Sequence, residues 1–122
     1  MKQERIRTAE TEELVSELSS AAIAYGELFD ASKNNQANKK ADLITTLYKE
    51  IRDRGPDAQR LLLRLLEHPN PDVRYWVATY SLQFSEDGVS ILRDLGEQPP
   101  GWRRHFARDA LRSWERDEII FP

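Results

Sequence analysis

The chain has 122 residues, of which 39% are hydrophobic and 32% charged, with no cysteine and a formal net charge of −3. This length predicts one domain with a hydrophobic core of ordinary size. The lack of cysteine excludes a disulfide scaffold and a thiolate metal centre. The longest uncharged stretches, residues 18–26 and 75–85, are too short to span a bilayer, and the charged start of the chain does not resemble a signal peptide. We therefore expect a cytoplasmic protein that does not enter a membrane.

Apolar residues follow helical spacing along the chain, and no segment alternates with the period of a strand. The first predicted helix has Thr8 as its N-cap and an apolar face that includes Leu14 and Leu18. Residues 30–38 lose this spacing and are predicted to form a loop. A second helix is predicted from about residue 38 to residue 54.

The second half of the chain predicts four shorter helices separated by glycine and proline. One begins near Pro56, and the next begins at Pro71 behind an Asn70 cap and continues to about residue 84. Ser85 is suited to cap a helix that ends at Gly96. The last helix is predicted over about residues 102–114.

An internal repeat links two of these segments. A shift that places Pro71 on Pro100 also places Arg74 on Arg103, and Ala78 then coincides with an alanine and Leu82 with a leucine. The repeat predicts a single helical-repeat domain over residues 1–122. Its parts are a helical pair at 1–54, hairpins at 55–84 and 85–116, and an apolar cap at 117–122.

The residues of the first hairpin carry a resemblance to a known family. The string from Leu65 to Arg74 reads Leu-Leu-Glu-His-Pro-Asn-Pro-Asp-Val-Arg and is followed by Ala78 and Leu82. It resembles a HEAT repeat, and the resemblance extends over about residues 55–114. The resemblance implies an all-α fold, a short right-handed α-solenoid of HEAT-like helical hairpins with about six helices.

The chain as a whole is also similar to short bacterial helical proteins of an uncharacterised family. HEAT-like proteins of this size occur among the immunity proteins of bacterial toxin systems. The resemblance therefore implies immunity against a toxin as one candidate function. Neither resemblance supplies catalytic residues.

The residues of chemical interest do not form an enzyme motif. His68 and His105 have no second histidine or cysteine at ligand spacing, and the chain has no glycine-rich phosphate loop or nucleophile elbow. His68 is interpreted as a turn residue that hydrogen-bonds locally, and His105 as a surface or partner contact. We expect no catalytic activity, no metal and no cofactor.

Helical geometry instead predicts a binding surface. One side of the two repeat-equivalent helices combines aromatic, polar and cationic residues, a composition typical of binding hot spots. These predicted partner-binding residues are Tyr75, Trp76, Thr79, Gln83, Arg104, His105, Arg108 and Arg112. Two other interpretations stay open. One is that Trp76 is part of the core. The other is that Asp109 and Glu115 neutralise, within the chain, the column of arginines at positions 104, 108, 112 and 116.

Two classes of function follow from this surface. The leading hypothesis is a non-catalytic protein interaction module that binds an acidic partner surface, in its sharpest form an immunity or antitoxin-like inhibitor. The alternative is a nucleic-acid or phosphate-binding protein that uses the C-terminal arginine column. The negative net charge of the chain disfavours the alternative. A small-ligand carrier is disfavoured because no cluster of converging polar residues is evident. The sequence leaves the partner and the oligomeric state open.

Overall fold

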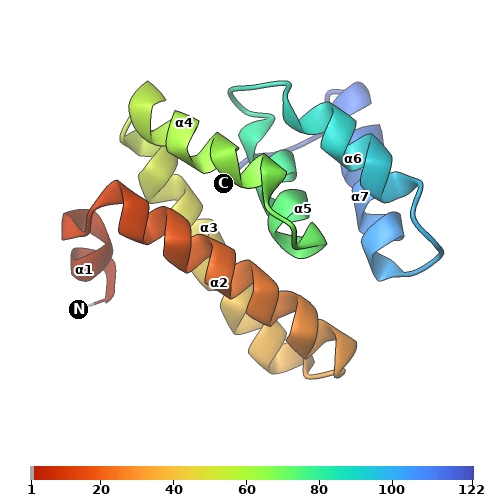
Figure 1. Ribbon diagram of the computed structural model, residues 1–122, viewed down its shortest axis with the longest axis horizontal. Helices are drawn as coiled ribbons and strands as arrows, with labels where there is room; N and C mark the ends of the chain where they lie inside the picture. The colour runs from red at the N-terminus through yellow and green to blue at the C-terminus, as the bar shows by residue number, and fades with distance from the viewer. Residues whose placement is uncertain (1) are drawn as a thin grey trace. The chain divides into compact units, whose positions relative to one another are not determined.

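The structure, a computed structural model, describes residues 2–122 and the side chains of residues 3–122. Over this range the chain forms seven α-helices, one short 3₁₀ helix and no strand (Figure 1). The predicted all-α class is confirmed, with one helix more than the sequence predicts. The chain divides into two compact units, one ending at Arg64 and the other beginning at Leu65.

The first unit contains α1 (Lys2–Thr8), α2 (Thr11–Asp30), α3 (Asn34–Asp53) and α4 (Pro56–Leu63). The two long helices, α2 and α3, form a hairpin, and α4 packs against both of them. Their facing apolar side chains are fully buried, because both helices are amphipathic. These side chains include Leu14, Leu18, Ile44, Leu47, Tyr48 and Ile51.

Helix α1 is the element that the sequence analysis missed. It carries the buried side chain of Ile6, and its end is fixed by Arg54 from the far end of α3. The guanidinium of Arg54 donates to the carbonyl oxygen of Ile6 at 3.0 Å and to Oγ1 of Thr11 at 2.9 Å. A contact with a residue this distant in the chain satisfies backbone groups at the end of α1.

Two predicted boundaries in this unit are wrong. Thr8 is the last residue of α1, where its Oγ1 donates to carbonyl oxygens of that helix, and Glu10 holds the N-cap position of α2. The predicted loop over residues 30–38 is shorter, since α3 already begins at Asn34. The first turns of α3 are polar except for Ala37, which is buried. Because this one small side chain gives little apolar periodicity, the sequence does not show the start of the helix.

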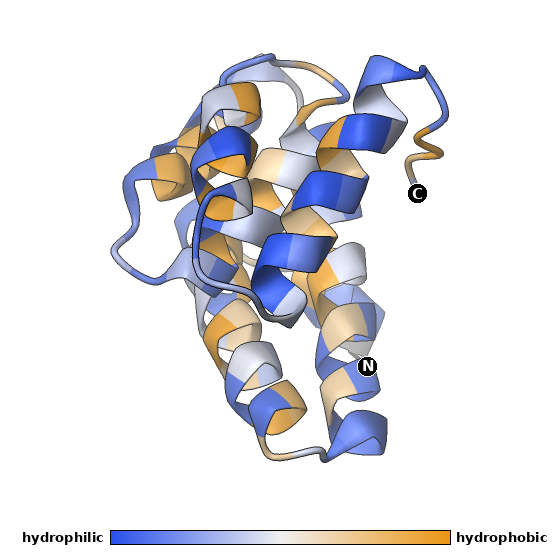
Figure 2. Cartoon of the chain, turned by 90° about the vertical axis from the view of Figure 1, so that its right-hand side faces the viewer, coloured by the Kyte–Doolittle hydropathy of each residue, from blue (hydrophilic) through white to orange (hydrophobic). Residues whose placement is uncertain are grey.

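The second unit contains α5 (Pro71–Ser81), α6 (Gly88–Gly96) and α7 (Trp102–Glu115). The 3₁₀ helix η1 (Arg64–Glu67) leads into it from the first unit. Helix α6 packs against both α5 and α7. Figure 2 shows the apolar residues of the helices as stripes beside hydrophilic ones, as expected of amphipathic helices.

The turn before α5 confirms two predictions. Oδ1 of Asn70 accepts hydrogen bonds from the amides of Asp72 at 2.8 Å and Val73 at 3.3 Å, which makes it the N-cap. Nδ1 of His68 accepts a hydrogen bond from the amide of Asn70 at 3.0 Å. His68 is therefore a turn residue with a local hydrogen bond, as the sequence indicated.

The connection from α5 to α6 differs from the prediction. Helix α5 ends at Ser81 rather than near residue 84, and Oγ of Ser85 accepts from the amide of Asp87, which holds the N-cap position of α6. The first residue of α6, Gly88, lies against the backbone of Ala78. A Cβ atom at Gly88 would be 2.6 Å from the carbonyl oxygen of Ala78, so this close helix crossing requires glycine.

One ion pair ties the start of α7 to the start of α5. Nε and Nη2 of Arg103 donate to the two carboxylate oxygens of Asp72 at 2.7 and 2.9 Å, and the Asp72 side chain is only 7% exposed. The guanidinium of Arg103 also lies over the ring of Trp102, 4.2 Å from its centroid. Bidentate geometry and burial make this the strongest polar link that we find between the helices of the second unit.

The division of the chain into units has a bearing on the predicted repeats. Helix α4 lies in the first unit and α5 in the second, although the sequence pairs them as a hairpin over residues 55–84. That hairpin and the single repeat domain stay predictions. None of the helices in the described range is long and apolar enough to cross a membrane.

The Asp72–Arg103 pair gives a direct stability prediction. Replacing Asp72 with Asn should lower the free energy of unfolding by about 2 kcal/mol, because it leaves a partly buried guanidinium without its charged partner. The measurement is denaturant unfolding followed by tryptophan fluorescence, since all three tryptophans lie in the second unit.

Asp57→Asn is the matched control. Asp57 is also the second residue of a helix that starts with proline, but its side chain is 94% exposed and its ion pair with Arg60 is on the surface. We expect a small effect there. Equal losses of stability in the two variants would contradict the role given to Arg103.

Candidate functional site

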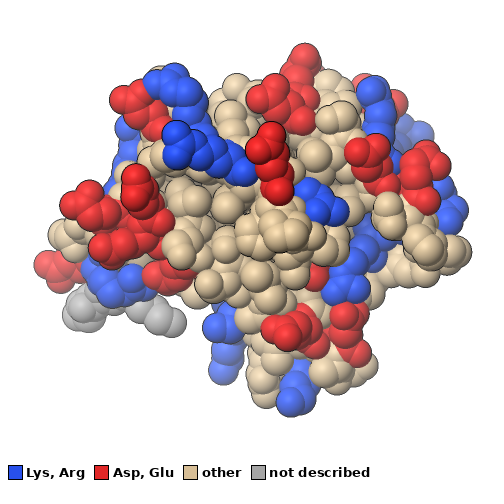
Figure 3. All heavy atoms as spheres, in the orientation of Figure 1, with Lys and Arg blue, Asp and Glu red and all other residues tan. Residues whose placement is uncertain are grey.

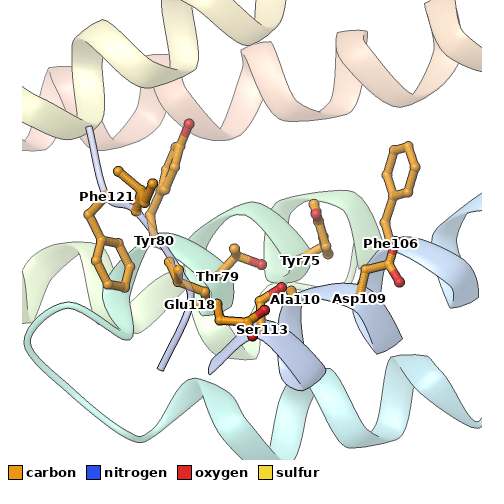
Figure 4. A pocket seen from close by; sticks show the side chains of 11 residues that line it. Tyr75, Thr79, Tyr80, Phe106, Asp109, Ala110, Ser113, Glu118 and Phe121 are labelled. Atoms are coloured by element: carbon orange, nitrogen blue, oxygen red, sulfur yellow. The ribbon is translucent and has the colours of Figure 1, made fainter. Parts of the chain in front are cut away.

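The second unit contains an open groove with a volume of about 490 Å³ (Figure 4). One wall is formed by α5, another by α7, and the third by the segment that follows α7. A volume of this size is in the range of ligand and anchor-residue sites. The lining residues are Tyr75, Thr79, Tyr80, Phe106, Asp109, Ala110, Ser113 and residues 118–121.

A continuous row of aromatic rings runs across α5 and α7. Ring centroids are 5.5 Å apart for Trp102 and Phe106, 6.3 Å for Phe106 and Tyr75, 5.9 Å for Tyr75 and Trp76, and 5.7 Å for Trp76 and Tyr80. These separations are typical of stabilising aromatic pairs. Three members of the row, Tyr75, Tyr80 and Phe106, line the groove and give it an apolar wall.

The edge of the groove on α7 carries a small charged cluster. Asp109 accepts from Nη1 of Arg112 at 3.1 Å through one carboxylate oxygen, and its other oxygen lies 3.2 Å from Nε2 of His105. The three residues are spaced by three and four positions, so they share one face of the helix. His105 and Arg112 are well exposed and available to a partner.

Two other arginines of α7 donate hydrogen bonds to carbonyl oxygens at, or just beyond, the end of α6. Nε of Arg108 donates to the carbonyl oxygen of Gly96 at 2.8 Å, and Nη1 of Arg104 donates to that of Gln98 at 3.4 Å. The Arg108 contact satisfies a carbonyl group that α6 leaves unpaired at its C-terminus, and the Arg104 contact lies two residues beyond that end. At 100° per residue, Arg104 and Arg108 point roughly opposite to the groove side of α7.

The structure therefore separates the eight predicted residues. Tyr75 and Thr79 line the groove, and Trp76 belongs to the aromatic row. His105 and Arg112 stand on the edge of the groove, whereas Arg104 and Arg108 contact the end of α6. Gln83 is exposed in the turn after α5. The predicted residues do not form one continuous row.

Sequence reasoning missed several residues of the groove, among them Phe106, Asp109, Ser113 and the segment 118–121. The internal repeat carries a signal for one of them, since the same shift places Val77 on Phe106 and so puts an apolar residue at this position in both helices. One polar atom in the groove wall is also notable. Oγ1 of Thr79 is shielded from solvent and has no hydrogen-bond partner among the described residues.

The charged groups of the described chain do not suggest a metal site or a large basic surface. No three His, Asp or Glu residues within the described range are grouped so that they could hold a metal ion. Figure 3 shows acidic and basic side chains interspersed on the face that it displays. The groove is thus distinguished by its aromatic wall and its short charged edge.

Comparison with models of known protein families assigns the chain to a family. A family described as Domain of unknown function (DUF2019) has a model that matches residues 12–98. The chain belongs to this family. The match to DUF2019 begins in the first turn of α2 and ends after α6, so α7 and the segment behind it lie outside the matched residues. Neither the curated proteins nor the solved structures give a significant match.

The different placements of the arginines on α7 can be tested by stability. Arg108→Ala should lower the free energy of unfolding by about 1 kcal/mol, because it removes a hydrogen bond to the end of α6 and the packing of the arginine stem on Gly96. Arg112→Ala should leave stability nearly unchanged, since its ion pair is exposed. Thermal and denaturant unfolding of both variants would check this, and an inverted order would contradict the placement.

Proposed function

We propose that this DUF2019 protein is a non-catalytic interaction module that binds a protein partner with its second unit. The observation that carries the proposal is the open groove with an aromatic wall and, at its edge, the exposed side chains of Arg112 and His105. Aromatic side chains beside arginine are enriched among residues that dominate binding energy. We propose cytoplasmic binding to a partner with an acidic surface.

The mechanism is steric and electrostatic. Tyr75 and Phe106 offer apolar contact area, while the guanidinium of Arg112 attracts carboxylates and orients the encounter. His105 beside it offers a hydrogen-bonding side chain. Asp109 contacts both Arg112 and His105 in the free protein, and a partner carboxylate would compete with it for them. In its sharpest form the proposal is an immunity or antitoxin-like inhibitor, which occludes the working surface of a toxin.

We further propose that α5–α7 belong to a short HEAT-like α-solenoid. The Asp72–Arg103 pair supports this arrangement, because it links the starts of the two helices that the internal repeat makes equivalent. In a solenoid, contacts between equivalent helices of successive repeats hold the stack together.

The alternative of nucleic-acid binding has less support from the geometry. Within the arginine column of Arg104, Arg108, Arg112 and Arg116, Arg104 and Arg108 donate to carbonyl groups and Arg112 pairs with Asp109. The arginine column therefore offers a phosphate backbone fewer free cations than its sequence suggests.

Affinity capture tests the proposal. The tagged chain, expressed in its source cells, should retain a partner that is identified by mass spectrometry. A variant with His105→Glu and Arg112→Glu should retain at least about ten-fold less of it, because repulsion replaces attraction at the groove edge. The comparison is made at equal amounts of folded protein.

A variant with Ser90→Glu and Arg93→Glu is the matched control. Both of these residues are exposed on α6, and the charge change is the same. The control should retain the partner as well as the unchanged chain does. Equal capture by all three proteins would refute the proposed surface.

A further inference from the structure

The segment that follows α7 already lies in the groove. Residues 118–121 line it without forming a helix or a strand. Ile119 and Phe121 are half-buried, whereas Ile120 between them is 94% exposed. Alternation with a period of two is the pattern of an extended chain that lays one side against a surface.

The segment is attached to α7 through a helix-terminating turn. Asp117 adopts a left-handed conformation with a φ of 57°, and the amide of Glu118 donates to the carbonyl oxygen of Ser113 at 2.8 Å. Beyond this turn, the amides of residues 119–121 make no backbone hydrogen bond within the described chain. The segment therefore lies in the groove without a ladder of backbone hydrogen bonds, and its apolar contacts come from Ile119 and Phe121.

The segment also fills the groove incompletely. About 490 Å³ stays open between it and the two helices (Figure 4). Protein interiors are close-packed and contain few voids larger than a water molecule. The open volume leaves room for a further segment beside residues 119–121.

We propose that the groove is a receptor for an extended partner segment with apolar side chains at alternate positions and acidic residues beside them. Residues 119–121 act as its built-in competitor. The inference rests on the proposed function, since it specifies what the partner inserts. The acidic flank follows from the exposed guanidinium of Arg112 at the edge, and the segment itself begins with two acidic residues, Asp117 and Glu118.

Peptide binding in trans tests the inference with the full-length chain. The probe is a fluorescein-labelled hexapeptide with the sequence of residues 117–122, followed by fluorescence anisotropy. A chain with Ile119→Ser and Phe121→Ser should bind this peptide at least about ten-fold more tightly than the unchanged chain, because its own competitor is weakened. A chain with Ile120→Ser is the matched control and should behave like the unchanged chain.

Changes in the peptide and in the groove make the test specific. Serine at the peptide positions of Ile119 and Phe121 should abolish binding, whereas serine at the position of Ile120 should preserve it. Adding Ser113→Trp to the double-serine chain fills the groove and should also abolish binding. Peptide affinity that departs from any of these three expected results would overturn the inference.

A fixed structural cap gives a different result. In that case the double-serine chain melts at a lower temperature and gains no affinity for the peptide, which overturns the proposal. Hydrogen exchange of the unchanged chain is an independent check. The amides of residues 119–121 should exchange at nearly the rate of an unfolded chain, and strong protection would contradict a displaceable segment.

The outcomes separate this inference from the proposed function. The peptide assay uses purified chain and no partner. A partner whose capture depends on the groove edge, together with no peptide binding to the double-serine chain, contradicts the receptor inference alone. Capture that does not depend on the groove edge contradicts the proposed function.

Discussion

The arrangement of the second unit depends on the pairing of Asp72 with Arg103. Arg103 stands in the first turn of α7, where the helix dipole disfavours a cation and where the helix has no acidic residue of its own. Asp72 stands in the first turn of α5, where the dipole favours its charge. Their bidentate contact offsets the unfavourable interaction of Arg103 with the helix dipole and holds the first turns of the two helices side by side. Removing either partner leaves the other charge partly buried and uncompensated, which costs stability.

The groove follows from that arrangement. With the starts of α5 and α7 joined, Phe106 meets Tyr75 and the aromatic row continues from one helix to the other. Arg104 and Arg108 fix the opposite side of α7 to the end of α6. Within the second unit, the segment over residues 118–121 covers the side of α7 beyond the aromatic contact only in part.

Local signals predicted much of the fold, while contacts between distant residues decided what was missed. The Asn70 cap and the close-packed apolar faces follow from short sequence patterns. Helix α1 does not, because Ile6 is its one large apolar side chain and its end depends on Arg54. For the site, helical spacing selected Tyr75 and Thr79 as partner-binding residues, and the structure places both in the groove wall. Helical spacing could not reveal that Arg104 and Arg108 bond to carbonyl oxygens near the end of α6, because this contact depends on where α6 ends in space.

The central claim is that Asp72 and Arg103 act as one unit, and a double-mutant cycle measures this most directly. The cycle compares the free energies of unfolding of the unchanged chain, Asp72→Asn, Arg103→Met and the double variant, followed by circular dichroism. We predict a coupling energy of about 1.5 kcal/mol or more, as found for residues in direct charged contact. Additive losses, with a coupling below about 0.5 kcal/mol, would contradict the account.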